Sequence, residues 1–206
     1  MNDTLDVGMV SRELKDKEIE KLGEHKSWLV GKDAVAIATS ARNPLAGLKR
    51  SISSEEVARI FSGEIAHYRD LNKALPNGEI VLLARDAGAG STELLQEEVM
   101  KERQISKKAL QLPSQGALLQ KLQNNHSAVA YISSGLVAQS DNALKSMVLD
   151  GVAASNENVM NGKYKLARPM YLLARGTPSP YVKAFADYVL SEGQKVVERQ
   201  GYVPAR

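Results

Sequence analysis

Short runs of consecutive apolar residues alternate along the chain with segments in which apolar residues recur every three or four positions. The runs at 34–38, 80–84 and 128–132 are typical of strands buried within a sheet. The periodic segments, such as 182–190, are typical of helices with one apolar face. This alternation predicts an α/β protein with mixed, mostly parallel sheets flanked by helices.

Local signals predict where several elements begin and end. Ser53 or Ser54 is expected to cap the start of one helix, with Gly63 at its end, and Ser155 is expected to cap the start of another. Residues 28–39 contain two apolar runs separated by Gly-Lys-Asp at 31–33. This pattern predicts two strands joined by a hairpin-like turn.

The stretch 79–97 combines a strand, a loop of small residues and a helix, and the rest of the chain is organised around it. The apolar strand ends at Arg85, and the loop leads into an apolar-periodic run. A hydroxyl residue just before such a run is a good N-cap, so the helix is expected to start at Ser91 or Thr92.

A strand, a glycine-containing loop and a helix start of this kind can bind a small anion. Free N–H groups and the helix dipole favour negative charge, and the guanidinium of Arg85 suits phosphate or carboxylate. An ordinary strand-to-helix turn without a ligand has the same pattern, so this stretch alone leaves both interpretations open. No Gly-Lys-Ser/Thr follows the glycines and no Gly-x-Gly-x-x-Gly is present, which disfavours a nucleotide site.

Composition removes several classes of function. The chain has no cysteine, so disulfides and thiolate chemistry are excluded, and His25, His67 and His126 lie far apart without a metal-ligand spacing. No metal or cofactor is therefore expected. The net charge of +3 is spread without a basic block, and two Phe and one Trp make a base-stacking surface improbable, so nucleic acid is not an expected partner. No Ser/His/Asp spacing or carboxylate pair indicates catalytic residues, and the chain is not expected to be an enzyme.

The termini and apolar runs bear on localisation. No apolar run approaches the roughly 20 residues of a membrane-spanning helix. The N-terminal sequence Met-Asn-Asp-Thr-Leu-Asp is acidic and lacks the basic and apolar regions of a signal peptide. The polypeptide as given is therefore not expected to carry one.

Several segments, in order and spacing along the whole chain, resemble the phosphate-binding proteins of bacterial phosphate ABC transporters. These proteins are periplasmic binding proteins with two lobes that close about a hinge. The resemblance is carried by residues 6–14 (DVGMVSREL), 33–37 (DAVAI) with 43–44 (NP), 60–65 (IFSGEI), 85–91 (RDAGAGS), 128–133 (AVAYIS), 162–164 (GKY) with 166–171 (LARPMY), 190–191 (LS) with 193–194 (GQ), and 201–204 (GYVP).

The resemblance implies the two-lobed, type II fold of periplasmic binding proteins. One lobe would comprise residues 1–38 and 169–206, and the other residues 39–168. The family normally begins with a further N-terminal segment that contains a strand and a Gly-Ser-rich loop, so the first lobe is expected to be truncated. A lobe without its first strands would expose apolar sheet surface, which favours a homodimer.

The resemblance also implies site residues. The family's loop Arg-x-x-x-Ser-Gly-Thr falls on Arg85, Ala89, Gly90 and Ser91. Ala89 lacks the first hydroxyl and keeps its backbone N–H, and a lost hydrogen bond to a charged group is worth roughly 1.5–3 kcal/mol. Thr92 would substitute only if the loop were shifted.

A second set of contacts is implied near the N-terminus. Ser11 aligns with a ligand position of the first lobe, and Arg12 would then lie beside the cleft. The alternative interpretations are a helix N-cap for Ser11 and a solvated side chain for Arg12.

Family members bind one phosphate between their lobes and transfer it to a membrane permease without catalysing a reaction. The resemblance thus implies a phosphate-binding protein of an ABC importer, located in the periplasm or at the outer face of the membrane. Two alternatives stay open. One is a binding protein for another oxyanion, such as sulfate or molybdate, because Ala89 weakens the phosphate motif. The other is a truncated relative that acts as a protein-interaction module without a ligand.

Overall fold

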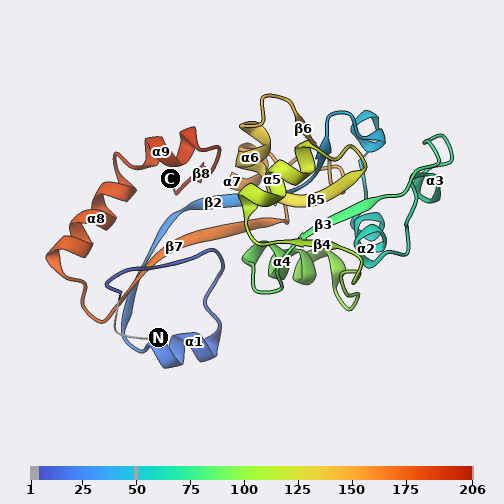
Figure 1. Ribbon diagram of the computed structural model, residues 1–206. Helices are drawn as coiled ribbons and strands as arrows, with labels where there is room; N and C mark the ends of the chain where they lie inside the picture. The colour runs from blue at the N-terminus through green and yellow to red at the C-terminus, as the bar shows by residue number, and fades with distance from the viewer. Residues whose placement is uncertain (1–4, 49–50, 206) are drawn as a thin grey trace. The chain divides into compact units, whose positions relative to one another are not determined.

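The computed structural model describes residues 5–48 and 51–205 and divides the chain into two compact units. Unit 1 comprises Met1–Asp33 and Arg168–Arg206, and unit 2 comprises Ala34–Ala167. The chain passes from one unit to the other within strand β2 (His25–Ser40) and again at the start of strand β7 (Ala167–Arg175), as Figure 1 shows. Each unit has its own strands and helices.

Unit 2 is built on a mixed sheet with β5 (Ala128–Ser133) at its centre. β5 pairs antiparallel with the second half of β2 and parallel with β3 (Val81–Arg85). β3 in turn pairs parallel with β4 (Leu110–Leu112), and β6 (Leu144–Ser146) pairs antiparallel with the end of β2. Every residue of β5 is buried, as expected for a strand covered on both faces.

Helices cover both faces of this sheet. Figure 1 shows α5 (Gln115–Gln123) and α6 (Ser134–Ala138) over one face, with α2 (Ser54–Ser62) and α4 (Gly90–Leu95) over the other. The remaining helical segments of unit 2 are η1 (Pro44–Gly47), α3 (Tyr68–Leu71), the π-helix η2 (Gln96–Met100) that continues α4, and α7 (Asn156–Met160).

The alternation of side chains along β5 assigns its residues to two separate layers of core. Ala130 and Ile132 belong to a fully buried cluster on the α5 side. Tyr131 points to the opposite face, where its ring meets Phe61 of α2 edge-on, with ring centroids 5.4 Å apart. The strand therefore holds an aliphatic layer on one side and an aromatic pair on the other.

The described residues of unit 1 form a smaller sheet and three helices. β1 (Gly8–Val10) pairs antiparallel with β7, β7 neighbours β2, and β8 (Val203–Pro204) pairs antiparallel with the first half of β2. The helices are α1 (Asp16–Leu22), α8 (Pro180–Leu190) and α9 (Gln194–Arg199). Neither β1 nor α9 contains a buried residue, so the core of this unit is small.

Ser53, rather than Ser54, caps α2, and the predicted roles of Gly63 and Ser155 are confirmed. Ser53 Oγ accepts a hydrogen bond from the Glu56 N–H at 3.1 Å, and Gly63 ends α2 in the left-handed conformation with φ of 86°. Ser155 Oγ likewise accepts from the Asn158 N–H at 3.3 Å at the start of α7. These signals are local, which is why the sequence alone contains them.

The hairpin-like turn predicted at residues 31–33 is wrong, because β2 runs through it as one continuous strand. Gly31 serves a different purpose there. A Cβ on Gly31 would lie 2.6 Å from the carbonyl oxygen of Val203 in β8, so only glycine lets the two backbones approach this closely. The glycine marks a close contact with the C-terminal strand rather than a change in chain direction.

The prediction of mixed sheets flanked by helices is confirmed, but the predominance of parallel pairing is wrong. Within the described residues, β3 pairs parallel with β4 and β5, whereas β1–β7, β2–β5, β2–β6 and β2–β8 are antiparallel. The continuous β2 accounts for most of the difference. This single long strand forms three of the antiparallel pairings, those with β5, β6 and β8. A turn at residues 31–33 would have distributed these pairings over two shorter strands.

Candidate anion-binding site

The loop between β3 and α4 holds most of the predicted site residues, and α4 begins earlier than expected. The helix starts at Gly90, with Ala89 as its N-cap in an extended conformation and without a capping side chain. The prediction that Ser91 or Thr92 caps the helix is therefore wrong, because both residues already lie in its first turn. An uncapped start leaves helix N–H groups available.

The backbone donors at this helix start fall into two groups. The Ala89 N–H donates to the Asp86 carbonyl at 3.1 Å, and the Thr92 N–H donates to the Ala89 carbonyl at 2.8 Å. The N–H groups of Gly90 and Ser91 find no acceptor in the part of the chain that the structure describes. Two adjacent N–H groups therefore remain for a ligand, and the helix dipole adds partial positive charge beside them.

The two hydroxyls of the first turn have different environments. Thr92 Oγ1 lies 2.8 Å from Tyr131 Oη, so this hydroxyl is directed into the sheet and neither caps the helix nor replaces the missing hydroxyl of Ala89. Ser91 is 1% exposed, and its Oγ has no hydrogen-bond partner among the described residues. Leaving a buried hydroxyl unsatisfied costs about 1–3 kcal/mol, which an anion oxygen at this position would recover.

The Arg85 guanidinium is held in place largely by neutral groups. Nε donates to the Leu112 carbonyl at 3.0 Å, and Nη2 donates to the Pro113 carbonyl at 3.3 Å. Asp86 also contacts Nη2 at 3.3 Å, but its side chain is 59% exposed, so solvent screens this ion pair. Nη1 has no partner among residues 5–48 and 51–205. Arg85 therefore keeps much of its positive charge and one free donor edge.

Ser11 and Arg12 belong to unit 1, and both have partners there. Ser11 Oγ accepts a hydrogen bond from Arg168 Nη1 at 3.3 Å. Arg12 donates from both Nη atoms to the Glu18 carboxylate at 2.7 and 2.9 Å, at the start of α1. The Arg12 hydrogen bond, helped by the Lys15 N–H, lowers the pKa of Glu18 from 4.5 to about 2.

Several residues that hold the predicted site residues within each unit were not anticipated from the sequence. Tyr131 supports the loop from β5, the carbonyl groups of Leu112 and Pro113 orient Arg85, and Arg168 holds Ser11. A tyrosine within an otherwise aliphatic buried strand was one available signal, since a buried phenol needs a hydrogen-bond partner. The carbonyl groups of Leu112 and Pro113 could not be recognised in the sequence, because every residue type has a backbone carbonyl.

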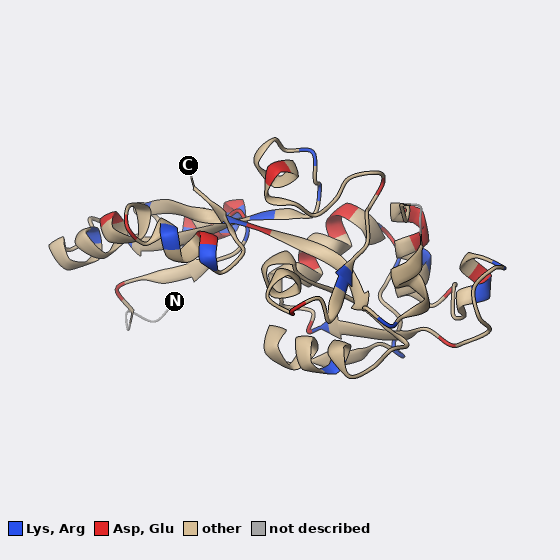
Figure 2. Ribbon diagram, turned by 90° about the horizontal axis from the view of Figure 1, so that it is seen from above, with Lys and Arg blue, Asp and Glu red and all other residues tan. Residues whose placement is uncertain are grey.

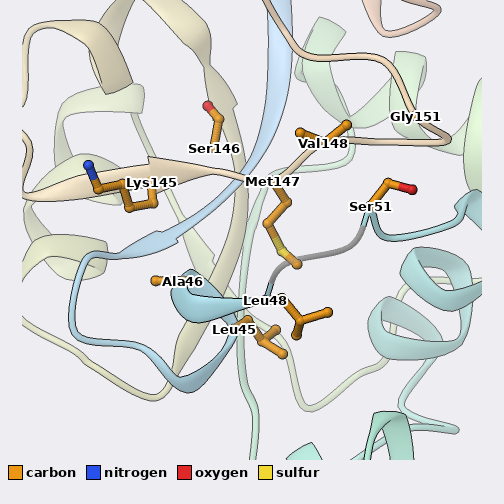
Figure 3. Close-up of a pocket in the computed structure, with 9 residues that line it drawn as sticks. All are labelled: Leu45, Ala46, Leu48, Ser51, Lys145, Ser146, Met147, Val148 and Gly151. Carbon is orange, nitrogen blue, oxygen red and sulfur yellow. The ribbon is translucent and has the colours of Figure 1, made fainter.

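A separate cavity of about 360 Å³ lies elsewhere on unit 2. Its apolar lining includes Leu45, Leu48 and Met147, and Figure 3 shows Met147 pointing toward the two leucines while Lys145 extends away from them. The residues lining this cavity include none from the β3–α4 loop. The cavity and the candidate anion site are therefore distinct features of the unit.

Charge and metal-ligand patterns add little to this site. Figure 2 shows basic and acidic residues interspersed along the elements of each unit. In the described part of the chain, no group of three or more His, Asp or Glu residues could hold a metal ion.

No described helix is both long and apolar enough to cross a membrane. The sequence of residues 1–6 predicts that the polypeptide as given carries no signal peptide, and residues 1–4 lie outside the described residues.

Curated proteins with related sequences include phosphate-binding proteins. The chain is 24% identical over 210 residues to the phosphate-binding protein PstS of Staphylococcus haemolyticus, covering 96% of this chain and 65% of that protein. It is 26% identical to PstS of Staphylococcus saprophyticus, with 96% and 64% covered. The chain thus spans slightly less than two thirds of the length of these curated relatives.

Structural similarity leads to the same group. The fold matches a Clostridium perfringens protein assigned as a phosphate ABC transporter substrate-binding protein, which was solved with bound phosphate, at a TM-score of 0.85 and 26% identity. The match covers 98% of this chain and 79% of that protein. Residues 1–193 also match the sequence model of the PBP superfamily domain. The predicted type of fold is thus confirmed, and the chain belongs to the PBP superfamily, the superfamily of periplasmic binding proteins.

Proposed function

We propose that this chain captures inorganic phosphate for an ABC-type importer and passes it to the membrane permease without catalysing a reaction. The observation that carries the proposal is the start of α4. There the N–H groups of Gly90 and Ser91 and the buried Ser91 Oγ have no partner among the described residues, and the Arg85 guanidinium belongs to the strand that leads into the same loop. Phosphate offers several acceptor oxygens and a negative charge, which match these donors.

Preorganisation of Arg85 supports binding of a desolvated anion. The carbonyl groups of Leu112 and Pro113 hold the guanidinium and do not neutralise it. Little side-chain freedom is then lost when the anion arrives, so more of the interaction energy contributes to affinity. A guanidinium that is 15% exposed also interacts more strongly with an anion than one in open solvent.

We further propose that units 1 and 2 are the two lobes of the binding protein and that Ser11 supplies a contact from unit 1. Arg168 holds Ser11 Oγ, and a donor on that oxygen favours a hydroxyl whose own proton is directed to a ligand. Arg12 is engaged by Glu18, which supports a structural role for Arg12 at α1. Capture of phosphate for an importer would take place in the periplasm or at the outer face of the membrane, and we propose that location for this protein.

Calorimetric titration with phosphate, sulfate and molybdate tests the proposal and separates it from the other oxyanions. Wild-type protein is expected to bind phosphate, and Arg85→Met is expected to lose at least about tenfold in affinity. Arg69→Met is the matched control, since Arg69 also donates from Nε to a carbonyl oxygen, that of Leu75, within the same unit. Tighter binding of sulfate or molybdate would favour the alternative ligand, and no heat with any of the three would contradict anion capture.

A second function, self-association through unit 1, is favoured by an aromatic row on α8. Tyr181, Phe185 and Tyr188 are 87%, 51% and 57% exposed, and their spacing of four and three residues places them on one helix face. Light scattering tests this function directly. A homodimer would be supported if the mass of the wild-type protein doubles as its concentration rises while Phe185→Ser stays monomeric. A wild-type protein that is monomeric at all concentrations would exclude it.

A further inference from the structure

We infer that Tyr131 is the positioning residue of the anion-binding loop, and that its hydroxyl fixes both ends of that loop. This inference rests on the proposed function, because it explains how the donors of Gly90 and Ser91 are kept in place. Tyr131 itself lies on β5, a different element from the strand and the helix that it connects.

The contacts form a closed ring of hydrogen bonds. The Arg85 N–H donates to Tyr131 Oη at 2.9 Å, and Tyr131 Oη lies 2.8 Å from Thr92 Oγ1. Either hydroxyl reaches the Arg85 carbonyl oxygen, each at 3.4 Å. If the Tyr131 hydroxyl donates to Thr92, the Thr92 hydroxyl donates to the Arg85 carbonyl. If instead the Thr92 hydroxyl donates to Tyr131, the Tyr131 hydroxyl donates to the Arg85 carbonyl. Both orders satisfy the N–H and the C=O of Arg85, and bonds in such a ring strengthen one another.

The ring encloses the segment that carries the free donors. Arg85 is the last residue of β3, Thr92 lies in the first turn of α4, and residues 86–91 span the interval. One phenol therefore sets the separation between the guanidinium-bearing residue and the helix start. Because a hydrogen bond to an anion weakens steeply with distance and angle, this separation affects affinity directly.

Apart from the hydrogen bond from the Ala89 N–H to the Asp86 carbonyl, the loop contributes little to its own order. Residues 86–88 are exposed, and a Cβ placed on Gly88 would meet no atom within 4 Å. Ala89 provides no side-chain cap. The positions of the donors must therefore be imposed from the loop's ends, where Tyr131 is fully buried and packed against Phe61. Burial also raises the pKa of Tyr131, so the phenol keeps its proton at neutral pH and the ring stays complete.

The test compares phosphate affinity in Tyr131→Phe and in a matched control, Tyr68→Phe. Tyr68 is also a buried tyrosine of unit 2, and its hydroxyl accepts a hydrogen bond from Asn43 Nδ2 at 2.9 Å instead of one from the loop. Both variants are expected to show lowered melting temperatures. Measured well below those temperatures, Tyr131→Phe is expected to weaken phosphate binding about five- to tenfold, while Tyr68→Phe binds like wild type.

A second pair of variants tests the ring without altering Tyr131. Thr92→Ser retains the hydroxyl and is expected to bind phosphate like wild type, whereas Thr92→Val is expected to lose affinity as Tyr131→Phe does. The double variant Tyr131→Phe/Thr92→Val should bind phosphate no more weakly than either single variant, because both substitutions break the same ring of hydrogen bonds. This comparison also serves if Tyr131→Phe fails to fold.

The outcomes separate the inference from the proposed function. If wild-type protein does not bind phosphate, the proposed function fails. If wild type binds and Tyr131→Phe and Thr92→Val bind equally well, the function stands and the positioning role is overturned. An equal loss of affinity in Tyr68→Phe would also overturn it, because general destabilisation would then explain the effect.

Discussion

Asp33 and Arg168 form an ion pair, with Oδ2 and Nη2 2.8 Å apart, at the two positions where the chain leaves unit 1 and returns to it. Their side chains are 1% and 13% exposed. The pair links β2 to β7 across 135 residues of sequence, and Arg168 also holds Ser11. A buried contact thus joins the two strands through which the chain passes between its units.

Removing one partner of this pair is expected to be more damaging than removing both. Arg168→Met removes the Arg168 guanidinium from the buried Asp33 carboxylate and should lower the free energy of unfolding by about 3–5 kcal/mol. The double variant Asp33→Leu/Arg168→Met should recover most of this loss. Urea unfolding followed by fluorescence of Trp28, the only tryptophan of the chain and a residue of β2, measures both values. A loss below about 1 kcal/mol in Arg168→Met would show that the pair behaves as a solvated one.

The close approach of β2 and β8 predicts that Gly31→Ala is destabilising. The added methyl group would lie 2.6 Å from the Val203 carbonyl oxygen, so β8 must move, at a cost of about 1–3 kcal/mol. Gly47→Ala is the control, because a Cβ there meets nothing within 4 Å. The Val203 amide, which is the single N–H group of β8, should exchange faster in Gly31→Ala alone. Equal stability of the two variants would refute the packing argument.

The ion pair at α1 predicts a distinct pH dependence. Arg12 lowers the pKa of Glu18 from 4.5 to about 2, so the carboxylate stabilises the folded state above pH 4.5. That contribution is lost as the pH falls through the folded-state value near 2. Carbon-detected NMR titration of Glu18 should show this low pKa, and Arg12→Gln should raise it toward 4.5. A wild-type Glu18 that titrates at 4.5 would contradict the geometry.

The uncapped start of α4 predicts that Ala89→Ser stabilises unit 2. A serine at this N-cap position is worth about 0.5–2 kcal/mol in the ligand-free protein. The same hydroxyl restores the donor that the family motif carries, so phosphate affinity should rise up to about tenfold. Ala87→Ser, on an exposed loop position, is the control and should change neither quantity. Weaker phosphate binding by Ala89→Ser would show that the loop has adapted to a smaller side chain.

The parts of the fold that local chemistry determines could be predicted from the sequence. Ser53, Gly63 and Ser155 act on groups within three residues, so their roles are visible in the neighbouring letters. Gly31 was misinterpreted because a glycine for a turn and a glycine for close backbone approach look the same. The atom that distinguishes them belongs to Val203, at the other end of the chain.

The candidate site shows the same division. Arg85, Gly90 and Ser91 follow from a strand, a loop of small residues and a helix, and the family motif adds their roles. Thr92 was misjudged because its partner is Tyr131, 39 residues away, and the long-range contact overrode the capping preference. The carbonyl groups that orient Arg85 could not be predicted, since they depend on the pairing of β3 with β4.

The most direct test of phosphate capture at the start of α4 is a phosphate titration of the ¹⁵N-labelled chain, followed through its backbone amide resonances. The account predicts saturable downfield shifts of the Gly90 and Ser91 amides, because both N–H groups gain a charged acceptor. The Ala89 amide, which already donates to Asp86, should shift much less. Phosphate binding that leaves the Gly90 and Ser91 resonances unmoved, or no binding at all, would contradict the account.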